Sequence, residues 1–92
     1  MQTVRAIGIA QEALVWLAGR PEDLARFLAA SGAGPAELRG RSADPEFLGF
    51  VLDFLLEGDA AVLAFAAAAG LPPDAPGRAR AALPGGNAPD WT

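Results

Sequence analysis

The stretch DPEFLGFVLDFLLE, from Asp44 to Glu57, decides the fold of this chain. It begins with a capping aspartate, a proline suited to the first helical position and an acid in the first turn, which together are a strong helix start. From Phe47 to Leu56, large apolar residues are interrupted only by Gly49 and Asp53. The stretch therefore predicts a strongly hydrophobic helix over about residues 45–57.

A helical wheel places the few non-hydrophobic positions of this segment on one narrow strip, with Phe50 at its edge. The strip consists of Glu46, Gly49, Asp53 and Glu57. A helix that is apolar over the rest of its circumference must be covered on nearly every side. We therefore expect this helix to be buried in the core of the domain.

Weaker helices are predicted on both sides from apolar residues at helical spacing and from glycine and proline boundaries. Thr3 and Asp59 are the expected N-caps of the first and fourth of them, and Asp74 is the expected start of the last. The predicted segments are 3–18, 21–31, 36–41, 60–69 and 74–83. The fold class is thus all-α: a compact bundle of five or six short helices around residues 45–57. It forms a single domain over residues 1–83, followed by a flexible tail over 84–92.

Composition excludes several classes of function. The chain has 92 residues, 52% of them hydrophobic, and a net charge of -4, so phosphate backbones and anionic membrane surfaces repel it. Without cysteine it has no disulfide or thiolate metal site, and without His, Lys or Tyr it lacks the common general bases. No signal peptide or membrane-spanning segment is visible. We expect a cytoplasmic protein that is not an enzyme and binds no cofactor.

Several short motifs mark the chain from about Ala6 to Leu83. The most specific is VLDFLL at 51–56, and the others are PE at 21–22, RFL at 26–28, GPAELR at 34–39, DPEFL at 44–48 and LAFA at 63–66. In this order of motifs the sequence resembles a small bacterial family of uncharacterised helical proteins, known only as a domain of unknown function. It departs from the family at Arg20, where members typically carry an acid. The resemblance implies an all-helical fold and a cytoplasmic setting, and no activity.

Asp53 is the most informative polar residue. It could bind a cation, or pair with an arginine to hold a partner; the favoured alternative is a surface acid or a structural ion pair with an arginine such as Arg26 or Arg39. Glu46, Asp53 and Glu57 share one helix face, which suits a hard cation, but a solvated strip of acids is the favoured explanation.

Two further features are candidate interaction sites. The alanine-rich helix, with Val62 and Leu63, either keeps an apolar face for a homodimer or partner helix, or packs closely on the central helix. The turn from Gly32 to Arg41 is similar in outline to a helix-hairpin-helix DNA motif, with Arg39 and Arg41 as its basic residues, although the net charge makes nucleic acid an unlikely partner.

The function that the sequence favours is a protein-interaction or structural module, with an unknown protein or a second copy as its partner. The alternative is a small regulatory or nucleic-acid-associated protein acting through the Gly32–Arg41 turn. A metal binder that uses the strip of acids comes third.

Overall fold

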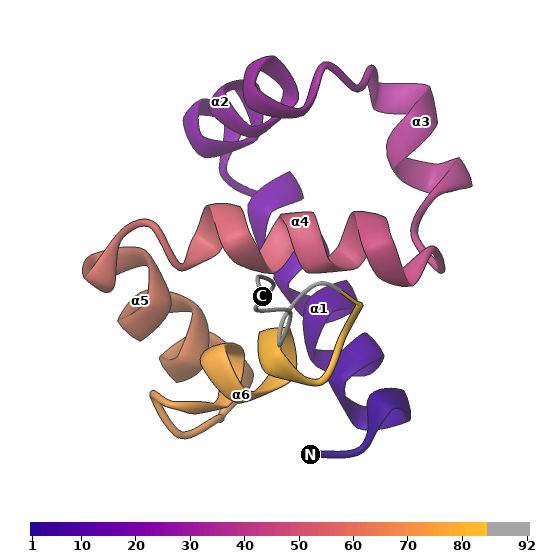
Figure 1. Cartoon of the computed structure of the whole chain (residues 1–92). Helices are drawn as coiled ribbons and strands as arrows, with labels where there is room; N and C mark the ends of the chain where they lie inside the picture. Colours follow the sequence, from indigo (N-terminus) through magenta and orange to yellow (C-terminus); the bar gives the residue numbers. More distant parts are fainter. Residues whose placement is uncertain (85–92) are drawn as a thin grey trace, which may run out of the picture.

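The computed structural model describes residues 1–84, and within them it contains six α-helices and no strand (Figure 1). The helices are α1 (Thr3–Ala18), α2 (Pro21–Ser31), α3 (Pro35–Gly40), α4 (Pro45–Leu55), α5 (Asp59–Ala69) and α6 (Ala75–Ala81). The predicted all-α fold is therefore confirmed. The predicted tail lies, but for Pro84, outside the described residues.

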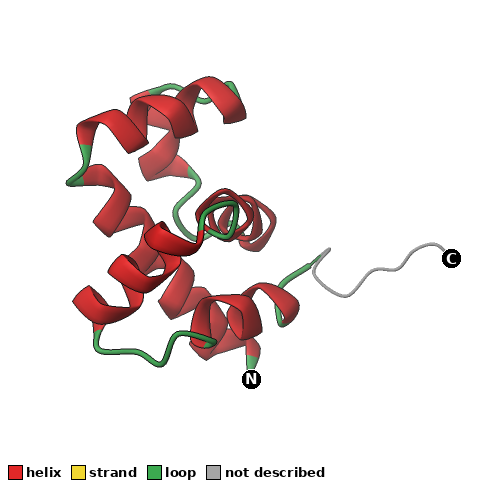
Figure 2. Ribbon diagram, turned by 90° about the vertical axis from the view of Figure 1, so that its left-hand side faces the viewer, coloured by secondary structure: helices red, strands yellow, loops and turns green. Residues whose placement is uncertain are grey.

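Two helices share the centre of the molecule. α4, the predicted core helix, packs against α1, α2 and α6, and α1 packs against α2, α4, α5 and α6. Figure 2 views α4 nearly along its axis and shows other helices above it, below it and to one side. The inner face of α1 carries the fully buried alanines Ala6, Ala10 and Ala13. Because these side chains are small, α4 and α6 can approach the axis of α1 closely.

Aromatic packing fixes α2 on α4. The ring of Phe27 in α2 is fully buried, and its centroid lies 5.4–5.8 Å from those of three phenylalanines in α4, namely Phe47, Phe50 and Phe54. Centroid separations of this size are typical of favourable edge-to-face and offset ring pairs. Phe27 is the one buried side chain of α2, and it joins this helix to α4.

Most helix boundaries follow the predicted signals. Asp44 caps α4 by accepting a hydrogen bond from the backbone N–H of Glu46 at 3.0 Å. Gly32 and Gly70 end α2 and α5 in the left-handed region, with φ of 72° and 70°. In that region a side chain is strained, so glycine is the favoured residue there.

The predicted N-caps Thr3 and Asp59 are wrong. Each is the first residue of its helix, and the residues before them, Gln2 and Gly58, make no side-chain capping bond. Other segment bounds also shift: α3 covers 35–40 rather than 36–41, α4 ends at Leu55 rather than near residue 57, and α6 covers 75–81 rather than 74–83. Local sequence therefore places each helix, but a nearby polar residue does not identify its cap.

Candidate functional site

Asp53 is joined to α6 by a bidentate ion pair. The Nε of Arg80 donates to Oδ1 of Asp53 at 2.6 Å, and Nη2 donates to Oδ2 at 3.1 Å. The remaining Nη1 donates to the carbonyl oxygen of Pro84 at 2.9 Å. The side chain of Arg80 is 17% exposed and that of Asp53 is 49% exposed. The partner is thus neither Arg26 nor Arg39, and Asp53 links two helices of the fold.

The strip predicted on α4 is only partly exposed, because Arg80 covers one of its positions. Glu46, Phe50, Asp53 and Glu57 are exposed, but Gly49 is buried. A Cβ atom at Gly49 would lie 2.8 Å from Nη1 of Arg80, so the missing side chain leaves the room that the guanidinium occupies. The exposed strip is therefore interrupted by a contact with α6.

The strip of acids does not form a metal-binding group. Among residues 1–84, no three Asp, Glu, His or Cys side chains lie close enough together to hold a metal ion. Glu46, Asp53 and Glu57 share a helix face, but the carboxylate of Asp53 is already engaged by Arg80. The geometry at this face is that of an interhelical ion pair.

The predicted basic pair, Arg39 and Arg41, is divided between two surfaces. Arg41 pairs with Asp44 at 3.3 Å, and its guanidinium lies 4.7 Å from the centroid of the Phe47 ring. Arg39 borders a hollow between α1 and α3 instead. The two arginines therefore do not form one basic patch.

In the turn that precedes Arg39 and Arg41, the backbone N–H groups already donate hydrogen bonds within the chain. The N–H of Gly32 donates to the carbonyl of Leu28 at 2.9 Å. The N–H of Ala33 donates to Ser31 Oγ at 3.1 Å, and that of Gly34 donates to Glu37 Oε1 at 2.9 Å. A phosphate bound in the manner of a helix-hairpin-helix motif would need such donors free.

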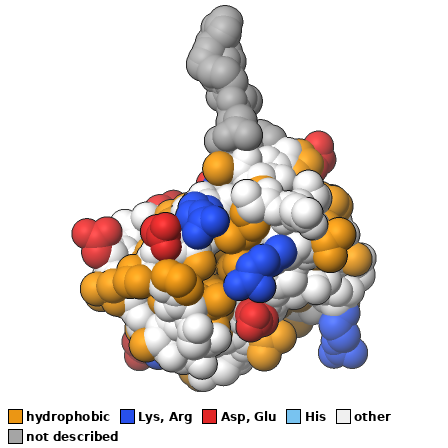
Figure 3. Space-filling model, turned by 90° about the horizontal axis from the view of Figure 1, so that it is seen from below, with side chains coloured by type: hydrophobic (Ala, Val, Ile, Leu, Met, Phe, Trp, Pro, Cys, Tyr) orange, Lys and Arg blue, Asp and Glu red, His pale blue; other side chains and the backbone are white. Residues whose placement is uncertain are grey.

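The alanine-rich helix α5 lies at the edge of the bundle. It packs against α1 and α6 rather than closely on α4, which contradicts the alternative that it packs closely on the central helix. Val62 is half-buried against the core, whereas Leu63 is 56% exposed. Its other exposed apolar residues are Ala60, Ala64, Ala67 and Ala68. In the view from below, on the side where α5 and α6 lie, hydrophobic side chains form several patches between separate charged groups (Figure 3).

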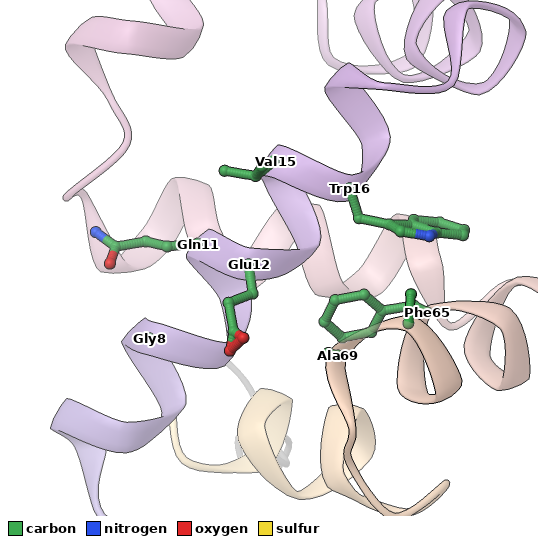
Figure 4. Close-up of a pocket in the computed structure, with 8 residues that line it drawn as sticks. Gly8, Gln11, Glu12, Val15, Trp16, Phe65 and Ala69 are labelled. Carbon is green, nitrogen blue, oxygen red and sulfur yellow. The ribbon is translucent and has the colours of Figure 1, made fainter.

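A groove of about 470 Å³ separates α5 from α1, and its lining is mostly apolar. At its floor the rings of Trp16 and Phe65 meet edge to face, with centroids 5.8 Å apart. Figure 4 shows Trp16 reaching from α1 toward Phe65, whereas Val15 and Gln11 point from α1 away from α5. Glu12 is the only charged residue in the lining.

The outer face of α1 continues from this groove to a second one. A hollow of about 320 Å³ lies between α1 and α3, and Val15 lines both hollows. Val15 is 73% exposed and Val4, on the same face, is 81% exposed. We call Val4, Gly8, Val15 and the two flanking hollows the α1 outer surface. This surface was not among the interaction sites predicted from the sequence.

The described part of the chain contains no helix that is long and apolar enough to cross a membrane.

The family of the chain is established by its sequence. A family model described as a protein of unknown function (DUF3572) matches residues 4–86, and the chain belongs to that family. This confirms the resemblance that the order of motifs indicated. No curated protein and no solved structure matches the chain significantly.

Proposed function

We propose that this member of the DUF3572 family is a non-enzymatic protein-interaction module and that the α1 outer surface binds its partner. The observation that supports the proposal most is the exposure of Val15 between two largely apolar hollows. An isolated exposed valine is ordinary on a protein surface. A large apolar side chain that separates two apolar hollows offers contiguous area to a partner.

The chemistry of this surface suits a protein better than a small polar ligand. Ligand pockets combine apolar walls with a few convergent polar groups. Here the amide of Gln11 already donates to the backbone carbonyl of Ser42 at 2.8 Å, which leaves Glu12 as the one charged group in the larger groove. Trp16 is partly buried beside Phe65, and the guanidinium of Arg20 lies 4.6 Å from the centroid of its ring. A partly buried tryptophan of this kind is typical of the anchor regions of protein interfaces.

The proposal places the module in the bacterial cytoplasm, as its family resemblance implies. The arginines Arg39 and Arg41 have no part in it as a nucleic-acid site, since they lie on separate surfaces and the chain is acidic. Arg39 borders the smaller hollow and can contribute a charge at the edge of the interface.

Site-specific photo-crosslinking in cells tests the proposal. A photoreactive amino acid replaces Val15 in one variant and Ala25, an exposed residue of α2, in a matched control. The proposal expects a discrete covalent adduct from position 15 and none from position 25, with the mass of the adduct identifying the partner. No adduct from position 15, or the same adducts from both positions, would overturn it.

A further inference from the structure

We infer that the partner is a second copy of this chain, and that the two copies pair α1 against α1 in antiparallel orientation. This inference rests on the proposed function, because it names the occupant of the same surface. Three features of α1 support it: an exposed apolar seam, a glycine that the isolated chain does not require, and two charges that complement each other only across a twofold axis.

The seam has the spacing of a helix-pairing surface. Val4, Gly8, Gln11 and Val15 follow one another at intervals of four, three and four residues, which is the alternation found along a coiled-coil contact. Gln11 does not obstruct the seam, because its hydrogen bond to Ser42 holds the side chain toward the neighbouring loop. The inward face of the same helix is already filled by the core, so the seam is a second, separate contact face.

Gly8 lies in the middle of this seam. Glycine inside a helix is less favourable than alanine by roughly 1 kcal/mol. A Cβ atom built at Gly8 would meet no atom within 4 Å, so packing among the described residues does not require glycine at this position. Close approach of another helix does require a small residue at the point of contact. Gly8 therefore leaves open space on the outer side of α1, into which a helix outside this chain can pack closely.

Arg5 and Glu12 indicate that the two α1 helices run in opposite directions. Both are exposed, and neither forms an ion pair with another of residues 1–84. They are seven residues apart and so lie on the same side of the seam. Arg5 also stands near the N-terminus of α1, where the helix dipole disfavours a cation. An anion from another molecule would offset that local cost.

An antiparallel pair satisfies all three features at once. With Val4 opposite Val15 of the second copy, Gly8 faces the second Gln11, and Arg5 comes beside the second Glu12. The twofold axis repeats each contact, so two valine pairs and two ion pairs form. In a parallel pair in register, Arg5 of one copy would lie at the same height as Arg5 of the other, and Glu12 at the same height as Glu12. Neither charge would then have an opposite charge beside it.

The twofold axis also brings α5 of both copies to the same side of the seam. Glu12 lines the α1–α5 groove, so the two ion pairs lie on that side. The exposed alanines Ala64 and Ala68 of α5 then widen the contact with small apolar side chains. Stable interfaces bury about 800 Å² per partner, which is a modest share of the 5092 Å² surface of this chain.

The test is the mass of the purified protein by light scattering over a range of concentrations, with charge-reversal variants. Wild type is expected at twice 9.4 kDa. Arg5→Glu and Glu12→Arg should each weaken the dimer about tenfold, since each sets like charges together twice. The double variant should return the affinity to within about threefold of wild type. Glu22→Arg, which makes the same change in net charge as Glu12→Arg on an exposed site of α2, should leave the dimer unchanged.

Gly8→Ala separates packing from folding. It should raise the melting temperature at dilute, monomeric concentrations, because alanine favours the helix, and weaken the dimer at least tenfold. A monomer at all concentrations would overturn the second copy as partner, while adducts of Val15 with another protein would still support the proposed function. Dimerisation without rescue in the double variant would overturn the antiparallel pairing.

Discussion

Replacing Gly49 with alanine should have opposite effects on stability with and without Arg80. Gly49 lies inside α4, where alanine normally favours the helix. In this protein the added Cβ would come 2.8 Å from Nη1 and 3.1 Å from Cζ of Arg80. The guanidinium must then leave its place above the glycine, and its hydrogen bonds to Asp53 and Pro84 are strained or lost.

The two contributions can be compared in size. The change from glycine to alanine inside a helix stabilises by roughly 0.5–1 kcal/mol. The bidentate pair and the third hydrogen bond of Arg80 are charge-assisted, but half of the Asp53 side chain is exposed, so their joint contribution is about 1–2 kcal/mol. We therefore expect Gly49→Ala to destabilise wild type by up to about 1.5 kcal/mol. In an Arg80→Ala background, where the space is empty, it should stabilise by roughly 0.5–1 kcal/mol.

Urea unfolding followed by circular dichroism measures all four proteins of this double-mutant cycle. Protein concentration must be the same throughout, because association of the folded state shifts apparent stability. The expected coupling free energy between the two positions is at least about 1 kcal/mol. The reasoning is refuted if Gly49→Ala stabilises both backgrounds equally.

Two further predictions concern the core and the helix ends. Phe27→Ala should destabilise the protein by about 3–5 kcal/mol, since this fully buried ring joins α2 to three rings of α4; a loss below about 1 kcal/mol in urea unfolding would contradict that role. Gly32→Ala should lower the unfolding free energy by about 1 kcal/mol, because φ is 72° at this position. The control Gly40→Ala, within α3 and with open space around it, should be neutral or stabilising. Equal effects at the two positions would argue against the left-handed cap.

The helices could be predicted because their signals are local. Proline at the first helical position, glycine at the end and the Asp44 cap act within a few residues, and all six helices follow from such signals. The order of packing could not be predicted in this way. Half of the buried residues of α1 are alanines, whose weak hydrophobicity did not reveal that this helix shares the centre with α4.

The candidate site was predicted in part. Leu63 is exposed on an apolar helix, as one of the two alternatives for the alanine-rich segment required. The partner of Asp53, in contrast, lies 27 residues away on α6, and no spacing rule identifies it. The outer surface of α1 was missed although the sequence contains its signal. Val4 and Val15 lie on the arc opposite the core-facing residues, with Gly8 between them, and a second apolar arc on a helix indicates a second contact.

Cysteine cross-linking tests the antiparallel pairing of α1 most directly, because the sequence contains no cysteine of its own. Val4→Cys and Val15→Cys variants, one carrying a size tag, are mixed and oxidised. The account predicts a rapid mixed disulfide between position 4 of one copy and position 15 of the other, and little product from Val15→Cys alone or from an Ala25→Cys control. Disulfide formation that is as fast for Val15→Cys alone as for the mixture would contradict the pairing, and so would the absence of any mixed product.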